Sequence, residues 1–211
     1  MLYKITSPIF LILILGVTFF STARAEETRR AYFAGGCFWC TEADFEKQEG
    51  VIDAISGFMG GRVANPTYEQ VASGQTGHRE TVEVIYDPAI ISYQKLLSAF
   101  WRMHDPSDAG GSFVDRGFQY SSAIYFTNEM EKRLALGAIA ALNASGKYDA
   151  PIATAVELAG PFYVAEDYHQ NYYKVSTVRY TYYRYRSGRD EHIFDKWHND
   201  TTVYQTENAP Q

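Results

Sequence analysis

The stretch RRAYFAGGCFWCTEADFEKQ (residues 29–48) predicts a strand, a glycine turn and a helix in immediate succession. RRAYFA favours a short strand, and Gly35-Gly36 interrupts it. Acidic residues crowd the opening turns of the segment that follows, and Gly50 ends it, so a helix is expected from Cys37 to about residue 48. The only two cysteines of the chain, Cys37 and Cys40, therefore lie one turn apart at the start of a helix.

The rest of the chain continues to mix strands and helices. ETVEVIYD alternates with period two, as a strand does, and Asn128 with Glu131 forms a capping-box pattern that opens a helix. The other expected strands are 51–59, 120–126, 152–158 and the tyrosine-rich RYTYYRYR at 179–186, and the expected helices are 67–72, 92–103 and 129–145. This pattern predicts one α+β domain in which helices pack on a sheet.

The N-terminus has the pattern of a secretory signal. Lys4 precedes an apolar run over residues 9–20, and the run ends in small residues up to Ala25. The run is short for a membrane span, which needs about 20 residues. We expect a signal peptide at 1–25 and a single catalytic domain at 26–211, exported to the periplasm or secreted. An uncleaved N-terminal anchor is the alternative.

Charge limits the partners of the expected mature chain. Removing Lys4 and Arg24 from 19 basic residues leaves 17 against 25 acids, a net charge of −8. Nucleic acid requires a basic patch, so a nucleic-acid partner is not expected, even at the tyrosines of 179–186. No stable membrane contact is expected once the signal is removed.

Three interpretations compete for the cysteine pair. A structural disulfide is common in exported proteins, but a bridge over so few residues removes little entropy from the unfolded chain. Zinc needs two more ligands, and the five histidines form no close pair, so no metal site is expected. Redox or nucleophilic chemistry fits best, because a helix start favours an anion and lowers the pKa of the Cys37 thiol. Cys37 would attack, and Cys40 would resolve.

Several long motifs, in order along the chain, resemble one known family. They are GGCFWC (35–40), GGRVANPTYEQVASGQTGHRETVEVIYDP (60–88), DRGFQYSSAIYF (115–126), GPFYVAEDYHQNYY (160–173) and SGRDEHIFDKW (187–197). Together they resemble the peptide methionine sulfoxide reductases of the A type over residues 30–198. The resemblance implies a two-layer α+β sandwich, a mixed sheet with a ferredoxin-like core and helices packed on it.

The resemblance also implies an activity and its residues. The activity is reduction of the S epimer of methionine sulfoxide, in proteins or as the free amino acid, with no bound cofactor and a thioredoxin-like external dithiol as reductant. The family's roles fall on the nucleophile Cys37, on the methyl-binding Phe38 and Trp39, on the acid Glu80, on the sulfoxide-binding Tyr68 and Tyr125, and on a supporting Asp167.

The chain departs from the commoner family pattern at two positions. Cys40 stands where a glycine usually follows the tryptophan, and this sequence has no later cysteine that could act as a distant resolving thiol. The chain therefore resembles the subset with a CFWC motif. Ser121 replaces an arginine in the QYRS motif, which affects a minor loop contact.

The chemistry also makes sense from the residues alone. A sulfoxide oxygen leaves only when it is protonated, and an ordinary Glu, with a pKa of about 4.3, is rarely protonated at pH 7. Burial raises that fraction. Glu80, like Val82, Val84 and Tyr86, occupies an even position of the expected strand, so these side chains point to the same face. Glu80 therefore faces the core if the other three residues do. A solvated acid at the strand end is the alternative.

Two other functions remain open from the sequence. CxxC also serves thiol–disulfide oxidoreductases that act on protein disulfides. An exported binding module with a small structural bridge would instead have unreactive thiols. The acid and tyrosines of the NPTY and GHRE motifs favour the sulfoxide reductase, because disulfide exchange does not need them.

Overall fold

One mixed sheet organises the computed structural model, which describes residues 28–200. Its strand order is β7-β6-β1-β3-β2-β8, and only β6 and β7 pair in parallel. The strands are β1 (Arg29–Ala34), β2 (Val51–Met59), β3 (Arg79–Tyr86), β6 (Ala123–Phe126), β7 (Ala155–Leu158) and β8 (Tyr163–Val164).

The centre of the sheet has the ferredoxin-like arrangement. In chain order it runs β1, α1 (Phe38–Phe45), β2, β3, α3 (Tyr93–Phe100) and β6, and in space these strands lie in the order β6-β1-β3-β2. The α+β fold with a mixed sheet is therefore confirmed. The first three predicted strands and the predicted helices agree with the structure, although α1 and α3 end about three residues early.

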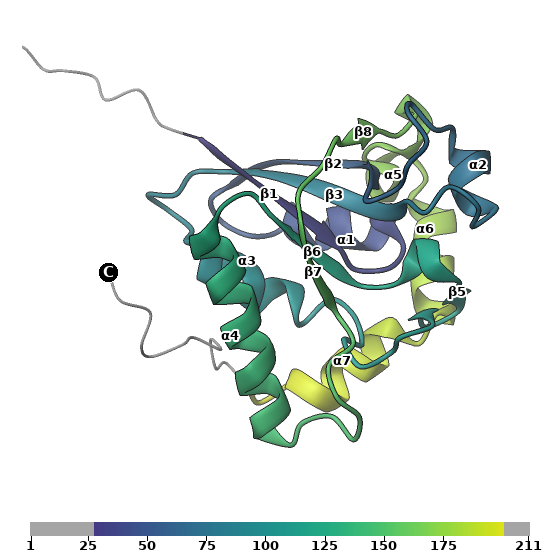
Figure 1. Ribbon diagram of the computed structural model, residues 1–211. Coiled ribbons are helices and arrows are strands. Elements are labelled where there is room, and N and C mark those ends of the chain that lie inside the picture. Colours follow the sequence, from purple (N-terminus) through teal and green to yellow (C-terminus); the bar gives the residue numbers. More distant parts are fainter. Residues whose placement is uncertain (1–27, 201–211) are drawn as a thin grey trace, which may run out of the picture.

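The helices cover one face of the sheet, which gives two layers (Figure 1). Phe33, Phe58, Val82 and Val84 point from the strands into the main core. Helices α1, α3 and α4 (Glu129–Ser145) pack on that face with their apolar sides. The opposite face carries a smaller cluster of Ala34, Met59, Ala123 and Tyr125, which Phe162 helps to cover.

Short elements gather at one end of the sheet, on the right of Figure 1. They are α2 (Tyr68–Ala72), the hairpin of β4 (Gly111–Ser112) and β5 (Asp115–Arg116), the 3₁₀ turns Phe118–Tyr120 and Asp167–His169, α5 (Tyr172–Val175) and α6 (Thr177–Arg186). Helix α7 (Arg189–Trp197) follows α6. Cys40 and Ala43 of α1 pack against Tyr180 of α6 in a separate cluster, so α1 is covered by the sheet on one side and α6 on the other.

The tyrosine-rich stretch is a helix, and the prediction of a strand at 179–186 is wrong. Its inward residues are Tyr180, Tyr183, Arg184 and Ser187, which follow the helical spacing of three and four. Arg184 bonds both carboxylate oxygens of Asp44 on α1 at 2.9 Å. This tertiary contact with α1 outweighs the preference of tyrosine for strands.

The expected signal peptide lies outside the described residues. Within residues 28–200, no helix is both long and apolar enough to span a bilayer.

Candidate active site

A sharp glycine turn sets the first thiol at the start of α1. Gly36 has φ +93, and Cys37 is the residue that caps the helix. A Cβ added to Gly36 would lie 2.3 Å from the Cβ of Ser112, so the hairpin β4–β5 packs directly on the turn. Both the backbone conformation and this close approach require glycine.

The two thiols face each other in the reduced state. Both cysteines are free and buried; Cys37 keeps 6% of its surface exposed and Cys40 none. Their side chains are linked by a hydrogen bond that raises the pKa of Cys37 and lowers that of Cys40.

The lower pKa of the pair falls on Cys40, contrary to the expectation for Cys37. Burial, more than any other factor, raises the pKa of Cys37. The hydrogen bond from Cys37 and the nearby guanidinium groups of Arg189 and Arg184 lower the pKa of Cys40 to about 7. The first amide of α1, which could have stabilised a Cys37 anion, donates instead to Glu80. The pair as a unit still releases its first proton easily.

Glu80 lies on the core face of β3 beside the start of α1. It is 2% exposed, and its Oε2 accepts a hydrogen bond from the Phe38 amide at 2.9 Å. Burial raises the pKa of Glu80 to about 8 against the opposing effect of that bond. Val82, Val84 and Tyr86 share its face in the core, as the alternation along the strand predicted. Glu80 is thus largely protonated at neutral pH and can act as an acid.

Aromatic rings surround the thiol turn. Phe38 is buried beside Tyr68, with ring centroids 6.2 Å apart, and Tyr68 lies 4.2 Å from the ring of His169. Trp39 stacks on Tyr172 at 3.8 Å and donates its Nε1–H to His169 Nδ1 at 3.1 Å. A cleft of about 530 Å³ opens beside these rings, lined by Trp39, Tyr68, Tyr168, His169, Tyr172, Val175, Ser176 and Arg179. This surface suits an apolar side chain with one polar end.

Two further polar residues reach the site from the loop after α3. Tyr120 interacts electrostatically with Glu80, Tyr68 and Cys37, and burial raises its pKa. Asp115 lies near Cys37 and Glu80 and accepts a hydrogen bond from the Tyr183 hydroxyl. Burial raises the pKa of Asp115 as well. The site thus brings a dithiol, a protonated carboxyl group and phenols together beside a partly apolar cleft, which Trp39 and Tyr68 line.

Comparisons with known proteins agree with this geometry. The family model of peptide methionine sulfoxide reductase matches residues 29–201. MsrA of Bacillus licheniformis is 47% identical over 173 residues, which is 82% of this chain and 96% of that protein. The chain belongs to the peptide methionine sulfoxide reductases of the A type.

Further relatives support the family and the fold. A MsrA/MsrB protein of Vibrio cholerae is 45% identical over 196 residues, and the chain spans about half (52%) of its length. Among solved structures, methionine sulfoxide reductase A of Corynebacterium diphtheriae is 33% identical with a TM-score of 0.63, covering 71% of this chain and 76% of that one. Reduced Mxr1 of Saccharomyces cerevisiae is 28% identical with a TM-score of 0.64, covering 71% and 86%. This reductase is a peptide-methionine (S)-S-oxide reductase.

Tyr125 does not join the site of the reductase, contrary to prediction. It lies on the sheet face opposite Glu80, in the cluster with Ala34 and Met59. Its hydroxyl donates to the Met59 carbonyl and accepts from Arg79. The sequence motif DRGFQYSSAIYF contains both tyrosines, and the alternation of β6 decides between them: Tyr120 precedes the strand and reaches the thiols, whereas Tyr125 points to the far face.

Asp167 is exposed and is not gathered with the thiols, so the structure does not support its predicted supporting role. Its neighbours in the AEDYH motif take that place instead. Glu166 accepts a hydrogen bond from the Tyr68 amide at 3.0 Å, and His169 packs against Trp39 and Tyr68. Asp115, Tyr120 and His169 are not predicted from the sequence as site residues, although each lies inside a motif that resembles the family.

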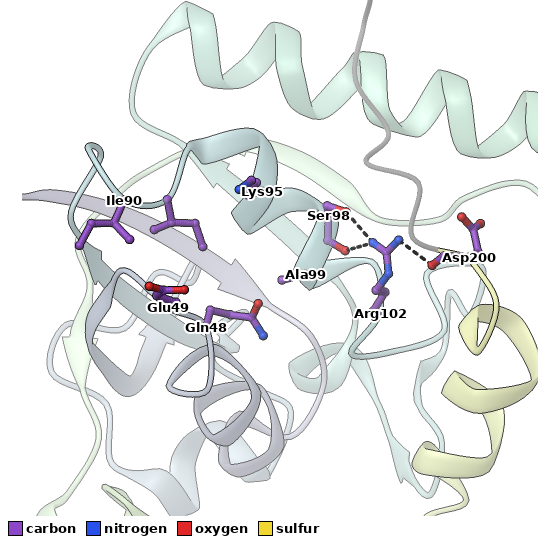
Figure 2. A pocket seen from close by; sticks show the side chains of 9 residues that line it. Gln48, Glu49, Ile90, Lys95, Ser98, Ala99, Arg102 and Asp200 are labelled. Atoms are coloured by element: carbon purple, nitrogen blue, oxygen red, sulfur yellow. Dashed lines mark hydrogen bonds between the residues drawn. The ribbon is translucent and has the colours of Figure 1, made fainter.

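A second cavity, of about 400 Å³, lies at the other end of α1 (Figure 2). Gln48, Glu49, Ile90, Lys95 and Ala99 are among its lining residues. Arg102 lies at one side of it, bonded to Ser98 and to the Asp200 carbonyl. The cavity contains none of the residues that surround the thiols.

Proposed function

We propose that Cys37 attacks the sulfur of methionine sulfoxide while Glu80 protonates the oxygen. Cys37 passes its thiol proton to the Cys40 thiolate as its sulfur bonds the substrate sulfur. The protonated oxygen then moves to Cys37 as a hydroxyl group, the bonds from the substrate sulfur to that oxygen and to Cys37 break, and methionine leaves, so Cys37 becomes a sulfenic acid. The observation that carries this proposal is the carboxyl group of Glu80, which is held protonated 2.9 Å from the amide that follows Cys37. A protonated acid beside a thiol suits a sulfoxide, because its oxygen leaves poorly without a proton.

The aromatic cleft would orient the substrate. Phe38 and Trp39 would receive the methyl group, and Tyr68 and Tyr120 would donate hydrogen bonds to the oxygen. Both phenols keep their protons, because burial raises the pKa of Tyr68 to about 12 and that of Tyr120 further. The substrates would be S-sulfoxides in oxidised proteins and free methionine S-sulfoxide.

The local pair would then complete the cycle as in the CFWC subset. The Cys40 sulfur attacks the sulfenic sulfur of Cys37, water leaves, and a disulfide forms. The sequence has only these two cysteines, so the disulfide must be reduced from outside. A thioredoxin-like dithiol supplies the two electrons, and no cofactor need be bound.

The N-terminal pattern supports an exported location. Residues 1–25 would direct the chain out of the cytoplasm and be removed after Ala25, leaving the enzyme in the periplasm or secreted. The reducing equivalents would then have to be delivered by a thioredoxin-like partner outside the cytoplasm.

Single and multiple turnover separate the two thiol roles. Cys37→Ser should abolish reduction of the S epimer even in a single turnover. Cys40→Ser should retain one turnover per enzyme and stall with a thioredoxin-like donor. The R epimer is the control substrate. Normal multiple turnover by Cys40→Ser with that donor would show that Cys40 does not resolve the intermediate.

An insulin-reduction assay tests the rival thiol–disulfide oxidoreductase. The proposed enzyme should reduce methionine S-sulfoxide and leave insulin disulfides almost untouched under the same supply of dithiol. Faster reduction of insulin than of the sulfoxide would favour the rival.

A further inference from the structure

Arg189, the first residue of α7, is a fully buried cation with no assigned role. Its motif, SGRDEHIFDKW, is one of those that resemble the family, but no step of the proposed reaction uses it. The side chain is 0% exposed. Burying a charge is costly unless an opposite charge or hydrogen bonds compensate it.

The guanidinium of Arg189 packs on the turn that carries the thiols. Its Nη1 donates to the carbonyls of Gly35 and Met103. A Cβ on Gly36 would lie 3.4 Å from Nη2, and the ring of Phe113 lies 4.9 Å from the guanidinium carbon. Arg189 thus contacts the backbone directly before Cys37.

Within the described residues, hydrogen bonds and ion pairs balance the charge of the Arg189 guanidinium only in part. Nε and Nη2 have no hydrogen-bond partner, and among residues 28–200 no carboxylate pairs with the guanidinium. The groups that interact with it electrostatically include the two thiols, Tyr183, Asp44 of α1 and Asp115 of β5, together with the imidazoles of His104 and His192. An anion on the dithiol would provide the missing counter-charge.

The other groups around Cys40 do not replace Arg189. Arg184 of α6 is balanced by Asp44 and Asp190. Glu80 of β3 is held protonated at neutral pH. The remaining groups that face the pair are Tyr180 and Tyr183 of α6, whose raised pKa values keep them neutral, and Asp115 of β5. Among residues 28–200, Arg189 is therefore the guanidinium beside the pair that forms no ion pair with a carboxylate, although Asp44 and Asp115 interact with it electrostatically.

We propose that Arg189 is a positioning residue of the dithiol, which holds the Gly35–Gly36 turn and supplies the counter-charge for one thiolate, on Cys40, in the reduced enzyme. This inference rests on the proposed Cys37–Cys40 disulfide. Arg189 therefore favours the reduced pair over the disulfide and makes the enzyme easier to recycle.

The recycling step balances as a two-electron exchange. A thiolate of the external dithiol attacks Cys37, which keeps a small exposed surface, whereas Cys40 has none. The disulfide bond breaks, and Cys40 leaves as the thiolate beside Arg189. The second donor thiol then displaces Cys37, so the donor becomes a disulfide, and Cys37 takes up one proton. A leaving thiol of low pKa departs faster.

Three variants test the proposal. Arg189→Met removes the positive charge. Arg189→Lys keeps the charge but replaces the planar guanidinium with an ammonium group. Arg79→Met is the matched control, because Arg79 is also buried but pairs with Glu157 on the other side of the sheet. Thermal unfolding and near-ultraviolet circular dichroism check that each variant folds. The readouts are the pH dependence of thiol alkylation and the dithiol–disulfide equilibrium with glutathione.

The expected result depends on pH in a way that a structural defect does not. Loss of the charge should raise the alkylation midpoint by about 1–2 pH units. The disulfide equilibrium should differ from wild type less than about twofold at pH 6, but by about 10–30-fold at pH 9, because only the ionised pair feels the charge. Arg189→Lys and Arg79→Met should stay close to wild type.

Other outcomes would overturn the proposal. They are an unchanged midpoint in Arg189→Met, a shift of the equilibrium that is the same at every pH, or a lysine variant that behaves like the methionine variant. If Arg189→Met does not fold, the wild type decides: a first midpoint at or above about 8.5, that of a free cysteine, overturns the proposal. A midpoint near 7 that Arg189→Lys retains supports it.

The test is independent of sulfoxide chemistry. The disulfide can be formed with oxidised glutathione, so the equilibrium is measurable whether or not the enzyme reduces sulfoxides. Failure of the proposed function would appear as no disulfide after incubation with methionine S-sulfoxide. If instead the Arg189 proposal fails, the disulfide forms normally, but its equilibrium with glutathione does not depend on the charge at position 189.

Discussion

At the scale of single residues, burial turns an ordinary glutamate into an acid that works at neutral pH. Glu80 can protonate the sulfoxide only while it keeps its own proton, and its pKa is raised to about 8. The rate of single-turnover reduction should therefore rise near pH 7, as the thiol pair loses its first proton, and fall above pH 8, as Glu80 loses its own. Stopped-flow measurement of S-sulfoxide reduction from pH 6 to 10 would give this profile.

A glutamine at position 80 should remove the decline of the rate above pH 8. Glu80→Gln cannot donate a proton as an acid, and we expect its rate to fall about 10²–10⁴-fold. The remaining activity should not show the decline near pH 8. If that decline persisted in the variant, another group would be responsible for it.

Two tyrosines in one motif should behave differently. Tyr120→Phe should lower the reduction rate, because it removes a phenol beside Glu80 and Cys37. Tyr125→Phe should leave the rate unchanged but cost about 1 kcal/mol of unfolding free energy, since its hydroxyl bonds Met59 and Arg79. Steady-state kinetics and urea unfolding of both variants test this contrast. A large loss of rate in Tyr125→Phe alone would reverse the assignment.

At the scale of elements, the glycine turn before α1 fixes the position of the nucleophile. Gly36→Ala should destabilise the fold by about 1–3 kcal/mol, because φ is +93 and the new Cβ would clash with Ser112. It should also slow the attack of Cys37. Urea unfolding and single-turnover rates measure the two effects.

Two controls separate backbone strain from the clash. Gly146→Ala meets nothing within 4 Å at φ +66, so it should cost only the backbone strain and leave the rate intact. Adding Ser112→Gly to Gly36→Ala should recover part of the lost activity. No recovery in the double variant would show that the clash is unimportant.

Local patterns predicted most elements, and they failed where tertiary contacts decide. The alternation of side chains along residues 79–86 correctly predicts that Glu80 lies on the core face, because one face of a packed sheet must be apolar. The tyrosine-rich 177–186 became a helix because Arg184 and Tyr180 dock on α1, which no local pattern reveals. Tyr120 and Asp115 reach the thiols through a long loop, whose path the sequence does not specify. The pKa order of the thiols depends first on the hydrogen bond between them and on burial, with a smaller effect of Arg189, which is about 150 residues away, and none of these follows from a local pattern.

At the scale of the whole molecule, the buried acid should make stability depend on pH. The pKa of Glu80 is about 8 in the folded state and about 4.3 in an unfolded chain. Its contribution is fully present below pH 4.3 and is lost as the pH rises to 8. Glu80→Gln should therefore gain stability relative to wild type between pH 5 and pH 8.5. Urea unfolding at both values measures this difference, and a constant difference would contradict the assignment.

The direct contact between the two thiols has a consequence for survival under peroxide. Because the Cys40 sulfur already lies against Cys37, a sulfenic acid there meets its partner before a second oxidant molecule arrives. Irreversible conversion to sulfinic or sulfonic acid requires that second encounter. An enzyme of this design can repair oxidised proteins while the oxidant is still present.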